Sequence, residues 1–589
     1  MAKKHNPQPR EKAGAPELVL KLLRRLADSP LPEVALTTTL ILIRWWDNSD
    51  FSYLAEIWVP AIFFAVLGSV VFLTYRLILG RGLAPHVASL ALIYAFYGYS
   101  FIEASRPAQV ALKALPDSWE TDFSKSIYLA ILLAIVCGAV GWLAGKAVRY
   151  KTVQSVQPYK VLLFTALFVL GFQLYKTADR WLDIRQQLAY QYPSPSLEKP
   201  SSGDVERPDI YYLVFDRYGN KEVLSDNFGY DNGDIYSYLS SHGFVNREDA
   251  YANYPFTMSS IASTMAMNYF PEFEEKFGGD GNWQSAAPYR SILNNPPIAQ
   301  VLEKHGYRFN QVSSWWDFTR VGIKADSNPT QAFLLSAGWG DWYLSDLQRD
   351  IINKSVLSPW LKKGITVGDS ALLKYDKALN PRQNFDAQMV ALKDLANRPD
   401  KSVPQFNFAH ILAPHPPYIF MPDGSDSNYD PEANDNGVDE TVKYKNSLQF
   451  VNNQLKSLVS EIQKASPNAI IILQSDEGPY PKQFRGPMSP EHYYDPLELP
   501  LPALKQKVGM LASYYLPGLD REKVKTIDSS VNIFRFVLNN YLGYNLPILP
   551  DCHISTGNKF TIYSYQQLPG GLTGNPVPEG CKAYDPAED

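Results

Sequence analysis

The chain has 589 residues, which is too long for one ordinary domain and leaves room for two or three. Its 55 Lys and Arg residues against 60 Asp and Glu residues give a formal net charge of −5. Proteins that bind nucleic acids usually carry a concentrated basic face, so this balance argues against that class of partner.

The first part of the chain contains apolar stretches that are long enough to cross a bilayer, which takes about 20 apolar residues in a helix. Four stretches are long and nearly uncharged, the last being the shortest: Leu54–Leu79, Leu83–Ile102, Ile127–Val148 and Val161–Tyr175. A fifth, Val34–Trp46, reaches the required length only if its helix begins near Pro30. Residues 1–185 are therefore predicted to form a transmembrane bundle of about five helices.

Lys and Arg residues predict the orientation of this bundle, because cytoplasmic loops near membrane spans are enriched in them. They gather before the first span, in the loop with Arg76 and Arg81, and between Lys146 and Lys160. With five spans these segments share one side of the membrane. The prediction is an integral protein of the plasma or inner membrane with a cytoplasmic N-terminus and an extracytoplasmic C-terminal part.

A second unit follows a linker at residues 186–208, where Tyr190–Pro208 is rich in Pro and Ser. Residues 209–589 contain continuous apolar runs that alternate with amphipathic helical patterns such as Thr441–Ala465. The runs are Ile210–Phe215, Arg308–Val312, Gln405–Leu412 and Ala469–Gln474. Such runs are typical of strands buried on both faces, so the unit is predicted to be an α/β domain with a mostly parallel sheet sandwiched by helices.

Polar residues follow each predicted strand, where open α/β sheets bind their ligands. Asp216 follows the first run, Ser313–Asp317 with Trp315 and Trp316 the second, His415 the third, and Asp476 with Glu477 the fourth. Any one of these Asp residues is more often a helix cap or turn residue. Together the carboxylates predict a site for a divalent cation that prefers oxygen ligands.

A candidate nucleophile is Thr257, which precedes a run of small residues that is compatible with a helix. A hydroxyl at a helix N-cap faces unpaired N–H groups, where a phosphate would bind, although a simple cap is the commoner role. A bound metal would favour the Thr257 alkoxide, so the site would combine Thr257 with Asp216 and Asp476.

The order of Asp216 after a strand, Thr257 opening TMSSIAS, AHILAPHPPY from Ala409 and SDEGP from Ser475 resembles the alkaline phosphatase and sulfatase superfamily. With its membrane anchor the chain is similar to the branch of lipoteichoic acid synthases and phosphoethanolamine transferases. The resemblance implies that Asp216 and Asp476 bind the metal. It also implies that Thr257 is a metal-bound nucleophile that becomes phosphorylated, and that His415 contacts the phosphoryl or leaving group.

The main departure from this family is Glu477, which stands where the family pattern Asp-His-Gly has a metal-binding His. If Glu477 is itself a ligand, the all-oxygen set favours manganese or magnesium over zinc, with zinc or calcium as further candidates. His492 is a candidate substrate residue or the source of the missing imidazole, and a degenerate site is the remaining alternative. His410 lies within an apolar strand and is expected to be a core histidine.

The resemblance implies a phosphotransferase that moves a phospholipid headgroup to an envelope glycan or lipid. The alternatives are a phosphate ester or phosphodiester hydrolase, and a catalytically silent envelope binding protein. Sulfatases carry Cys-x-Pro-Ser-Arg; here Thr257 stands at the Cys and Ile261 at the Arg, which argues against sulfate ester hydrolysis.

Two further features have their own alternatives. Trp315 and Trp316 could stack on a sugar or lipid headgroup, although packing is the commoner role of such aromatic residues. Cys552 and Cys581 lie in the C-terminal tail, where an oxidising compartment would permit a disulfide, against the alternative of two free thiols.

Overall fold

The protein is described here from a computed structural model. The described residues are 15–49, 52, 54–97, 122–148, 158–189, 192–193, 207–278, 286–320, 322, 324–330, 347–348, 351, 365–367, 370–373, 379–427, 439–481, 495–557, 562–569, 572–574 and 576–584. The chain divides into two compact units, of which the first contains Met1–Asp183 and Leu344–Tyr375 and the second Ile184–Tyr343 and Asp376–Asp589. Leu344–Tyr375 thus groups with the first unit, whereas the sequence boundary had placed it in the C-terminal domain.

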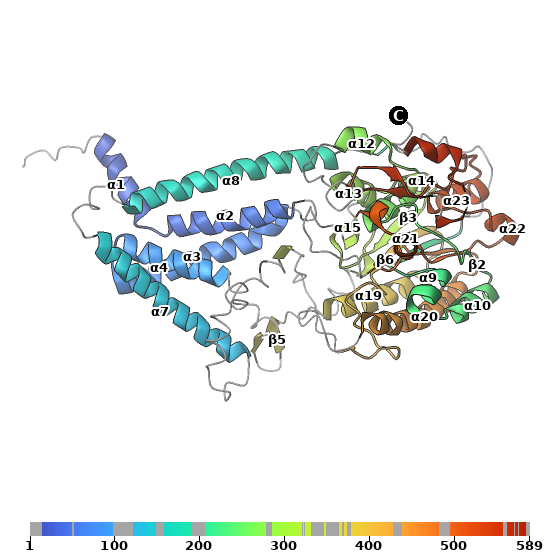
Figure 1. The fold of residues 1–589 in the computed structure, drawn as a ribbon, viewed down its shortest axis with the longest axis horizontal. Helices are drawn as coiled ribbons and strands as arrows, with labels where there is room; N and C mark the ends of the chain where they lie inside the picture. The colour runs from blue at the N-terminus through green and yellow to red at the C-terminus, as the bar shows by residue number, and fades with distance from the viewer. Residues whose placement is uncertain are drawn as a thin grey trace, which may run out of the picture. The chain divides into compact units, whose positions relative to one another are not determined.

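The first unit consists mainly of long apolar helices (Figure 1). Its elements are α1 (Ala15–Ala27), α2 (Leu31–Asp47), the short 3-10 helix η1 (Leu54–Ile57), α3 (Trp58–Leu79), α4 (Leu83–Tyr97), α7 (Asp122–Val148), α8 (Pro158–Leu188), which runs on into the second unit, and the hairpin β4 (Ile365–Val367) and β5 (Ser370–Leu373).

Two of these helices are long and apolar enough to cross a membrane, over Leu54–Leu79 and Lys160–Gln186. The pair Lys21–Ala27 and Leu31–Asp47 adds a third span if the two helices, bent by 57°, count as one. Among the described residues, Leu83–Phe96 and Ile131–Ala147 are shorter apolar helices. Within the described residues the helices long and apolar enough to cross a membrane thus number two, or three with the bent pair, and the expectation of about five spans stays a prediction.

The outer surface of this unit is apolar, as expected for helices that face lipid. Leu77 of α3 is 89% exposed and Phe168 of α8 is 75% exposed. The interior holds a buried polar contact between α2 and α4, in which Glu33 lies 2.8 Å from His86 Nδ1 and accepts a hydrogen bond from Ser89 at 2.7 Å. Hydrogen bonds of this kind hold helix pairs together in a bundle surrounded by lipid, because the hydrophobic effect does not drive helices together there.

The second unit is built on a six-stranded sheet in the order β2-β8-β7-β1-β6-β3. The strands are β1 (Ile210–Phe215), β2 (Val245–Asn246), β3 (Arg308–Val312), β6 (Gln405–Ile411), β7 (Ile470–Gln474) and β8 (Ala512–Tyr515). β7, β1, β6 and β3 run parallel, and β8 pairs antiparallel with β7. The predicted mostly parallel sheet is confirmed, and the four predicted strands match these bounds within one residue.

Helices cover both faces of the sheet (Figure 1). One layer contains α9 (Lys221–Phe228), α10 (Gly233–Ser241), α19 (Leu379–Ala396) and α20 (Glu440–Ala465); the other contains α11 (Thr257–Ala266), α13 (Ala287–Asn294), α14 (Pro297–Lys304) and α23 (Ile533–Tyr541). Smaller helices are α12 (Glu272–Phe277), α15 (Asp317–Arg320), α21 (Leu501–Val508) and α22 (Arg521–Val524).

The apolar sequence of β1 explains this arrangement, because alternate side chains of a strand point to opposite faces. Tyr211, Leu213 and Phe215 join the core under α19 and α20. Tyr212 points the other way and packs edge to face on Phe534 of α23, with ring centroids 5.2 Å apart. Since both faces of β1 are buried, the first charged side chain after it, Asp216, lies at the strand end, where the candidate site lies.

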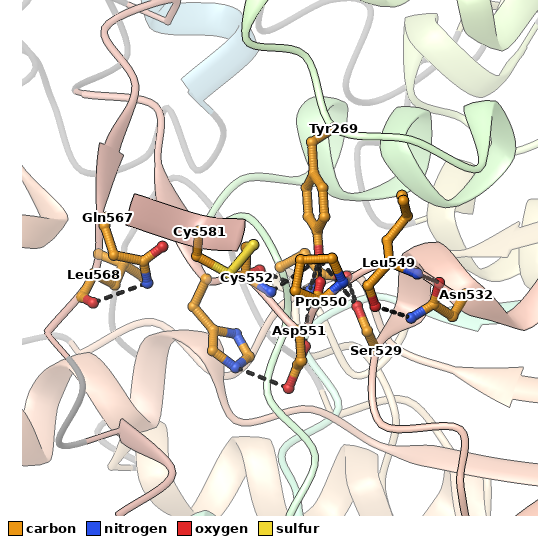
Figure 2. The surroundings of a disulfide bond; sticks show 12 residues. Tyr269, Ser529, Asn532, Leu549, Pro550, Asp551, Cys552, Gln567, Leu568 and Cys581 are labelled. Carbon is orange, nitrogen blue, oxygen red and sulfur yellow. Dashed lines mark hydrogen bonds and ion pairs between the residues drawn. A yellow bond between two sulfur atoms is a disulfide. The ribbon is translucent and has the colours of Figure 1, made fainter. Parts of the chain in front are cut away.

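The C-terminal part adds short elements and a covalent link. These are β9 (Ile554–Ser555), β10 (Gln566–Gln567) and the 3-10 helices η5 (Pro496–Glu498), η6 (Ser530–Asn532) and η8 (Glu579–Tyr584). A disulfide joins Cys552 to Cys581, and beside it the Tyr269 hydroxyl donates to the Pro550 carbonyl at 2.8 Å (Figure 2). The C-terminal segment is therefore fixed to the domain at the disulfide that the sequence analysis expected.

Candidate metal and phosphoryl-transfer site

The carboxyl edge of the sheet brings together two of the predicted carboxylates and one histidine. Asp216 follows β1, Asp476 follows β7, and His410 is the penultimate residue of β6. All three are buried, and one ligand atom from each lies within 4.8 Å of the others. This is the one group of three or more potential metal-binding side chains found among the described residues.

The ligand atoms of this group lack partners, which tests whether a metal ion fits. Asp216 Oδ1, Asp476 Oδ2 and His410 Nε2 are buried without a hydrogen-bond partner among the described residues. His410 Nε2 lies 3.3 Å from Asp216 Oδ2. Buried polar atoms are normally satisfied, so three partnerless atoms in a group whose ligand atoms lie within 4.8 Å of one another fit a divalent cation.

His410 was expected to be a core histidine, and its side chain is indeed fully buried. Its ring is held by Thr319, whose Oγ1 lies 3.0 Å from Nδ1. Thr319 is in turn 2.7 Å from the Ser314 hydroxyl. Metal-binding histidines usually have the second ring nitrogen fixed in this way, which leaves Nε2 to face Asp216. The signal in the sequence was a polar residue near the end of a predicted apolar strand.

The carboxylate of Glu477, which the sequence analysis assigned to the metal, is engaged by two cations. Arg217 Nε lies 3.0 Å from Oε1, and Lys507 Nζ lies 2.5 Å from Oε2. The side chains of Lys507 and Glu477 are 1% and 2% exposed. Glu477 thus forms a buried ion pair beside the metal-binding group, and sequence reasoning missed both Arg217 and Lys507.

The backbone explains how these two cations reach Glu477. Arg217 adopts a left-handed conformation with φ 61, which is uncommon for a residue with a side chain. Its N–H donates to Asp476 Oδ1 at 3.2 Å. Gly478 lies so close to the C-terminal end of α21 that an added Cβ would be 2.1 Å from the Gln506 carbonyl oxygen. That close approach, which only glycine permits, brings Lys507 beside Glu477.

Burial and charge set different protonation states for the two aspartates. Burial, and then the charges of Asp216 and Glu477, raise the pKa of Asp476 well above its usual range. Burial also acts to raise the pKa of Asp216, but His415, His410 and Arg217 outweigh it and hold that pKa below the usual range. Two neighbouring carboxyl groups that cannot both ionise easily would both be stabilised in the ionised form by a bound divalent cation.

Thr257 is the first residue of the ten-residue helix α11, whose N-cap is Phe256, so it lies one position further in than predicted. Its side chain forms a hydrogen bond with Asp476, which acts to lower the pKa of that carboxyl group. Ser260 on the same helix donates to the Asp476 carbonyl at 2.6 Å. The candidate nucleophile is therefore brought to the metal-binding group by the start of α11.

Each predicted tryptophan lies beside a histidine. Trp315 contacts His415, with ring centroids 6.3 Å apart, and Trp316 contacts His410 at 5.5 Å. Both tryptophans are half-buried, so each has a packing contact and a partly exposed surface. The substrate role predicted for them stays a prediction, and His492 lies outside the described residues.

His415 is oriented by its own loop. Its Nδ1 is hydrogen-bonded to the Pro416 carbonyl, which can only accept, so Nδ1 carries the proton and Nε2 has the free lone pair in the neutral ring. Burial, followed by the charge of Arg217, lowers the pKa of His415 to about 4. At neutral pH the ring can therefore accept a proton at Nε2.

This depressed pKa predicts how stability depends on pH. An unfolded histidine has a pKa of about 6.5, so between about pH 6.5 and 4 the unfolded chain binds more protons. The contribution of His415 is fully present above about pH 6.5 and is lost as pH falls through about 4. The unchanged chain should lose stability as the pH falls from about 6.5 to 4. His415→Gln has no imidazole to protonate, so we expect its free energy of unfolding to fall by roughly 1–3 kcal/mol less over the same range. Denaturant unfolding at a series of pH values measures this difference, with His242→Gln as the control. Equal losses of stability in His415→Gln and the unchanged chain would contradict the prediction.

Comparison with known proteins identifies the domain that carries this site. The sequence model of the Sulfatase family matches residues 223–538, which is more than half of the chain. The match includes Thr257, His410, His415, Asp476 and Lys507, whereas Asp216 precedes it. No curated protein sequence matches the chain.

Solved structures with some similarity include three bacterial proteins. Lipooligosaccharide phosphoethanolamine transferase A (EptA) from Neisseria meningitidis is 10% identical, with a TM-score of 0.37 over 88% of this chain and 95% of its own. The C-terminal periplasmic domain of EcEptC from Escherichia coli, in complex with zinc, is 12% identical, with a TM-score of 0.36 over 66% of this chain and 100% of its own. Lipoteichoic acid synthase LtaP from Listeria monocytogenes is 10% identical, with a TM-score of 0.31 over 62% of this chain and 78% of its own.

Proposed function

We propose that this chain, which belongs to the sulfatase family, is a metal-dependent phosphotransferase of the cell envelope. It takes the phosphoryl-linked headgroup of a membrane phospholipid onto Thr257 and passes it to a hydroxyl of an envelope glycan or lipid. The observation that carries the proposal is the convergence of Thr257 with the orphaned atoms of Asp216, His410 and Asp476.

Asp216, His410 and Asp476 would hold the divalent ion, with the Thr257 oxygen as a further ligand. This set has one imidazole and two carboxylates, so it suits zinc or manganese better than the all-oxygen set expected from the sequence. When bound, the ion would supply positive charge that favours the alkoxide form of Thr257 and neutralises the phosphoryl oxygens.

The side chains of the protein would carry out the bond changes and proton transfers of two steps. In the first step a bond forms between Thr257 Oγ1 and phosphorus, and the bond from phosphorus to the diacylglycerol oxygen breaks. The Thr257 proton passes in net to that departing oxygen. In the second step the acceptor hydroxyl attacks phosphorus, its proton goes to His415 Nε2, and the bond to Thr257 breaks; the proton then passes in net from His415 to Thr257 Oγ1. Arg217 would contribute positive charge beside the transferred group, and Lys507 holds Glu477 in place.

The apolar helices of the first unit support the choice of donor. A phospholipid stays in the bilayer, so an enzyme that consumes its headgroup gains from being tethered to the same membrane. The spans over Leu54–Leu79 and Lys160–Gln186 would provide that tether. The extracytoplasmic placement of the domain rests on the Lys and Arg distribution and is part of the proposal.

The test uses the full chain in detergent with phospholipids that carry an isotopic label in the headgroup and either zinc or manganese. We expect release of diacylglycerol and an adduct on the intact chain whose mass equals the phosphoryl-linked headgroup. An envelope glycan or lipid added as acceptor should then take up the label. Release of the free labelled headgroup to water, in the presence of acceptor, would favour a hydrolase, which the family match also supports.

Metal binding can be tested apart from turnover. We expect Asp476→Asn to hold far less zinc or manganese than the unchanged chain, which should keep roughly one ion after dialysis, because the substitution removes a charged ligand from a buried set. Elemental analysis of the protein gives the ratio of metal to chain. Asp520→Asn, at the exposed cap of α22, is the control. Undiminished metal in Asp476→Asn would place the ion elsewhere.

A further inference from the structure

The first helix of the membrane unit, α1, has its apolar and charged residues on opposite faces, which distinguishes it from the apolar helix α3. Residues three and four positions apart share one face of a helix. By this spacing one face of α1 is apolar, with Val19, Leu22, Leu23 and Leu26. The opposite face carries three cations, Lys21, Arg24 and Arg25. The helix is therefore amphipathic and basic.

Both faces of α1 are exposed at the surface of the unit. Val19 and Leu22 are 54% and 56% exposed. The three cations of the opposite face are exposed as well, and they form no ion pair with any residue that the structure describes. An apolar stripe beside a cationic stripe, both without protein neighbours to cover them, is typical of helices that lie in the interface of a membrane.

The angle between α1 and α2 is set by side chains from other helices. The two helices are bent by 57° relative to each other (Figure 1). At the end of α1, Arg76 of α3 donates to the Asp28 carbonyl at 2.5 Å and to the Asp28 carboxylate at 2.9 Å. His86 of α4 donates from Nε2 to the Ala27 carbonyl at 2.9 Å. The bundle therefore holds α1 at an angle to α2.

The histidine at this bend is itself fixed inside the bundle. A carbonyl can only accept, so the contact with Ala27 places a proton on His86 Nε2. The other ring nitrogen, Nδ1, lies 2.8 Å from Glu33 Oε1, and both side chains are fully buried. Phe72 of α3 stacks on the ring, with centroids 4.5 Å apart. The bend is thus formed by buried side chains of α2, α3 and α4.

The helix α2 reaches across most of a bilayer without any contribution from α1. Its 17 residues extend over roughly 25 Å at 1.5 Å per residue, against a hydrocarbon core of about 30 Å. A straight continuation through α1 would bring Lys21, Arg24 and Arg25 toward the hydrocarbon, where charged side chains are strongly disfavoured. The bend instead turns α1 toward the plane of the membrane, where its cations can stay at the level of the headgroups.

We propose that α1 is an interfacial helix that binds anionic phospholipids, with its apolar face among the acyl chains and its cations on the headgroup phosphates. Arg81, which is 82% exposed and lies 3.7 Å from Asp28, adds a cation beside the same bend. The exposed apolar face selects a lipid over a free phosphate ion, because only a lipid supplies acyl chains. This inference goes beyond the proposed transfer, since Thr257 and the metal site belong to the other unit.

Lipid selectivity is measured on the full chain in detergent by native mass spectrometry, with phosphatidylglycerol and phosphatidylcholine of identical acyl chains as probes. We expect phosphatidylglycerol to bind about tenfold or more tightly, because each cation near an anionic surface strengthens binding about fivefold. Replacing Arg24 and Arg25 together by Gln should remove most of this preference. Thr257→Ala should keep the preference, since donor binding at the metal site is a separate event.

A second pair of cations in the membrane unit provides the matched control. Lys146→Gln combined with Lys160→Gln also removes two positive charges, from the end of α7 and the start of α8. This variant should keep the preference for phosphatidylglycerol. Equal losses in the two double variants would show that the total charge of the unit is responsible, and that result would overturn the proposal. An unchanged chain with no preference would overturn it as well.

A separate measurement tests the placement of the helix. Single cysteines replace Val19 or Lys21 in a Cys137→Ala chain, in which the two remaining native cysteines form the disulfide. In lipid nanodiscs, Val19→Cys should react with a water-soluble maleimide about tenfold more slowly than Lys21→Cys, because acyl chains cover the apolar face. Equally fast reactions would place α1 in water, and equally slow ones would place it within the bilayer core. Either result would contradict an interfacial helix.

Discussion

Replacing Thr257 with alanine is expected to abolish headgroup transfer, with a fall in rate of about 10⁴-fold or more, because the substitution removes the atom that forms the covalent intermediate. The fold should survive, since Thr257 is the first residue of α11 and the N-cap position belongs to Phe256. The measurements are diacylglycerol release from the labelled phospholipid and the intact mass of the chain. The mass increase seen in the unchanged chain should be missing.

Two variants on the same helix make this result specific. Thr257→Ser keeps a hydroxyl at the same atom and should form the adduct at a reduced rate. Ser259→Ala removes a different hydroxyl of α11, which donates to the Phe256 carbonyl at 3.1 Å, and should react normally. An adduct of unchanged mass in Thr257→Ala would show that another side chain is the nucleophile.

The second large effect concerns stability at the same site. We expect Lys507→Met to destabilise the domain by about 3 kcal/mol, because breaking a buried ion pair leaves Glu477 with uncompensated charge. Arg217 remains at 3.0 Å from the other oxygen of Glu477, which should limit the loss. Burial lowers the pKa of Lys507 although Glu477 acts to raise it, which is consistent with a strongly desolvated pair. Denaturant unfolding of the purified chain measures the change.

A matched lysine and a double variant decide the cause. Lys505 lies two residues earlier and pairs with Glu222 at 2.9 Å, but both side chains are partly exposed, at 29% and 45%. Exposed pairs contribute at most about 1 kcal/mol, so Lys505→Met should have a much smaller effect. Combining Lys507→Met with Glu477→Gln should recover part of the stability, since the buried charge is removed as well. Equal losses for both lysine variants would exclude a special role for the buried pair.

The pairing of Glu477 changes how the departure from the family pattern is understood. From the sequence, a glutamate at the position of the metal-binding histidine suggested an all-oxygen site, a site completed by His492, or a degenerate one. In the structure the glutamate is neutralised by Arg217 and Lys507, and an imidazole is available from His410. We therefore propose that the site is active with a different histidine, and metal analysis of His410→Ala would test that assignment.

The sequence by itself determined the framework of the protein, because local patterns specify local structure. Apolar runs of about six residues predicted β1, β3, β6 and β7 within one residue, since strands buried on both faces need continuous apolar side chains. The rule that parallel strands end at one edge then placed Asp216 and Asp476 together. The long apolar helix Leu54–Leu79 was likewise predicted with its observed bounds.

Only the tertiary structure decided which side chains meet at that edge. His410 is separated from Asp216 by 194 positions in the numbering, and its role depends on the pairing of β6 with β1. Lys507 comes 30 residues after Glu477, and it reaches the carboxylate because Gly478 allows the end of α21 to approach. Contacts of this kind depend on register, loop approach and burial, which arise when the whole sheet is assembled and leave no local pattern in the amino-acid sequence.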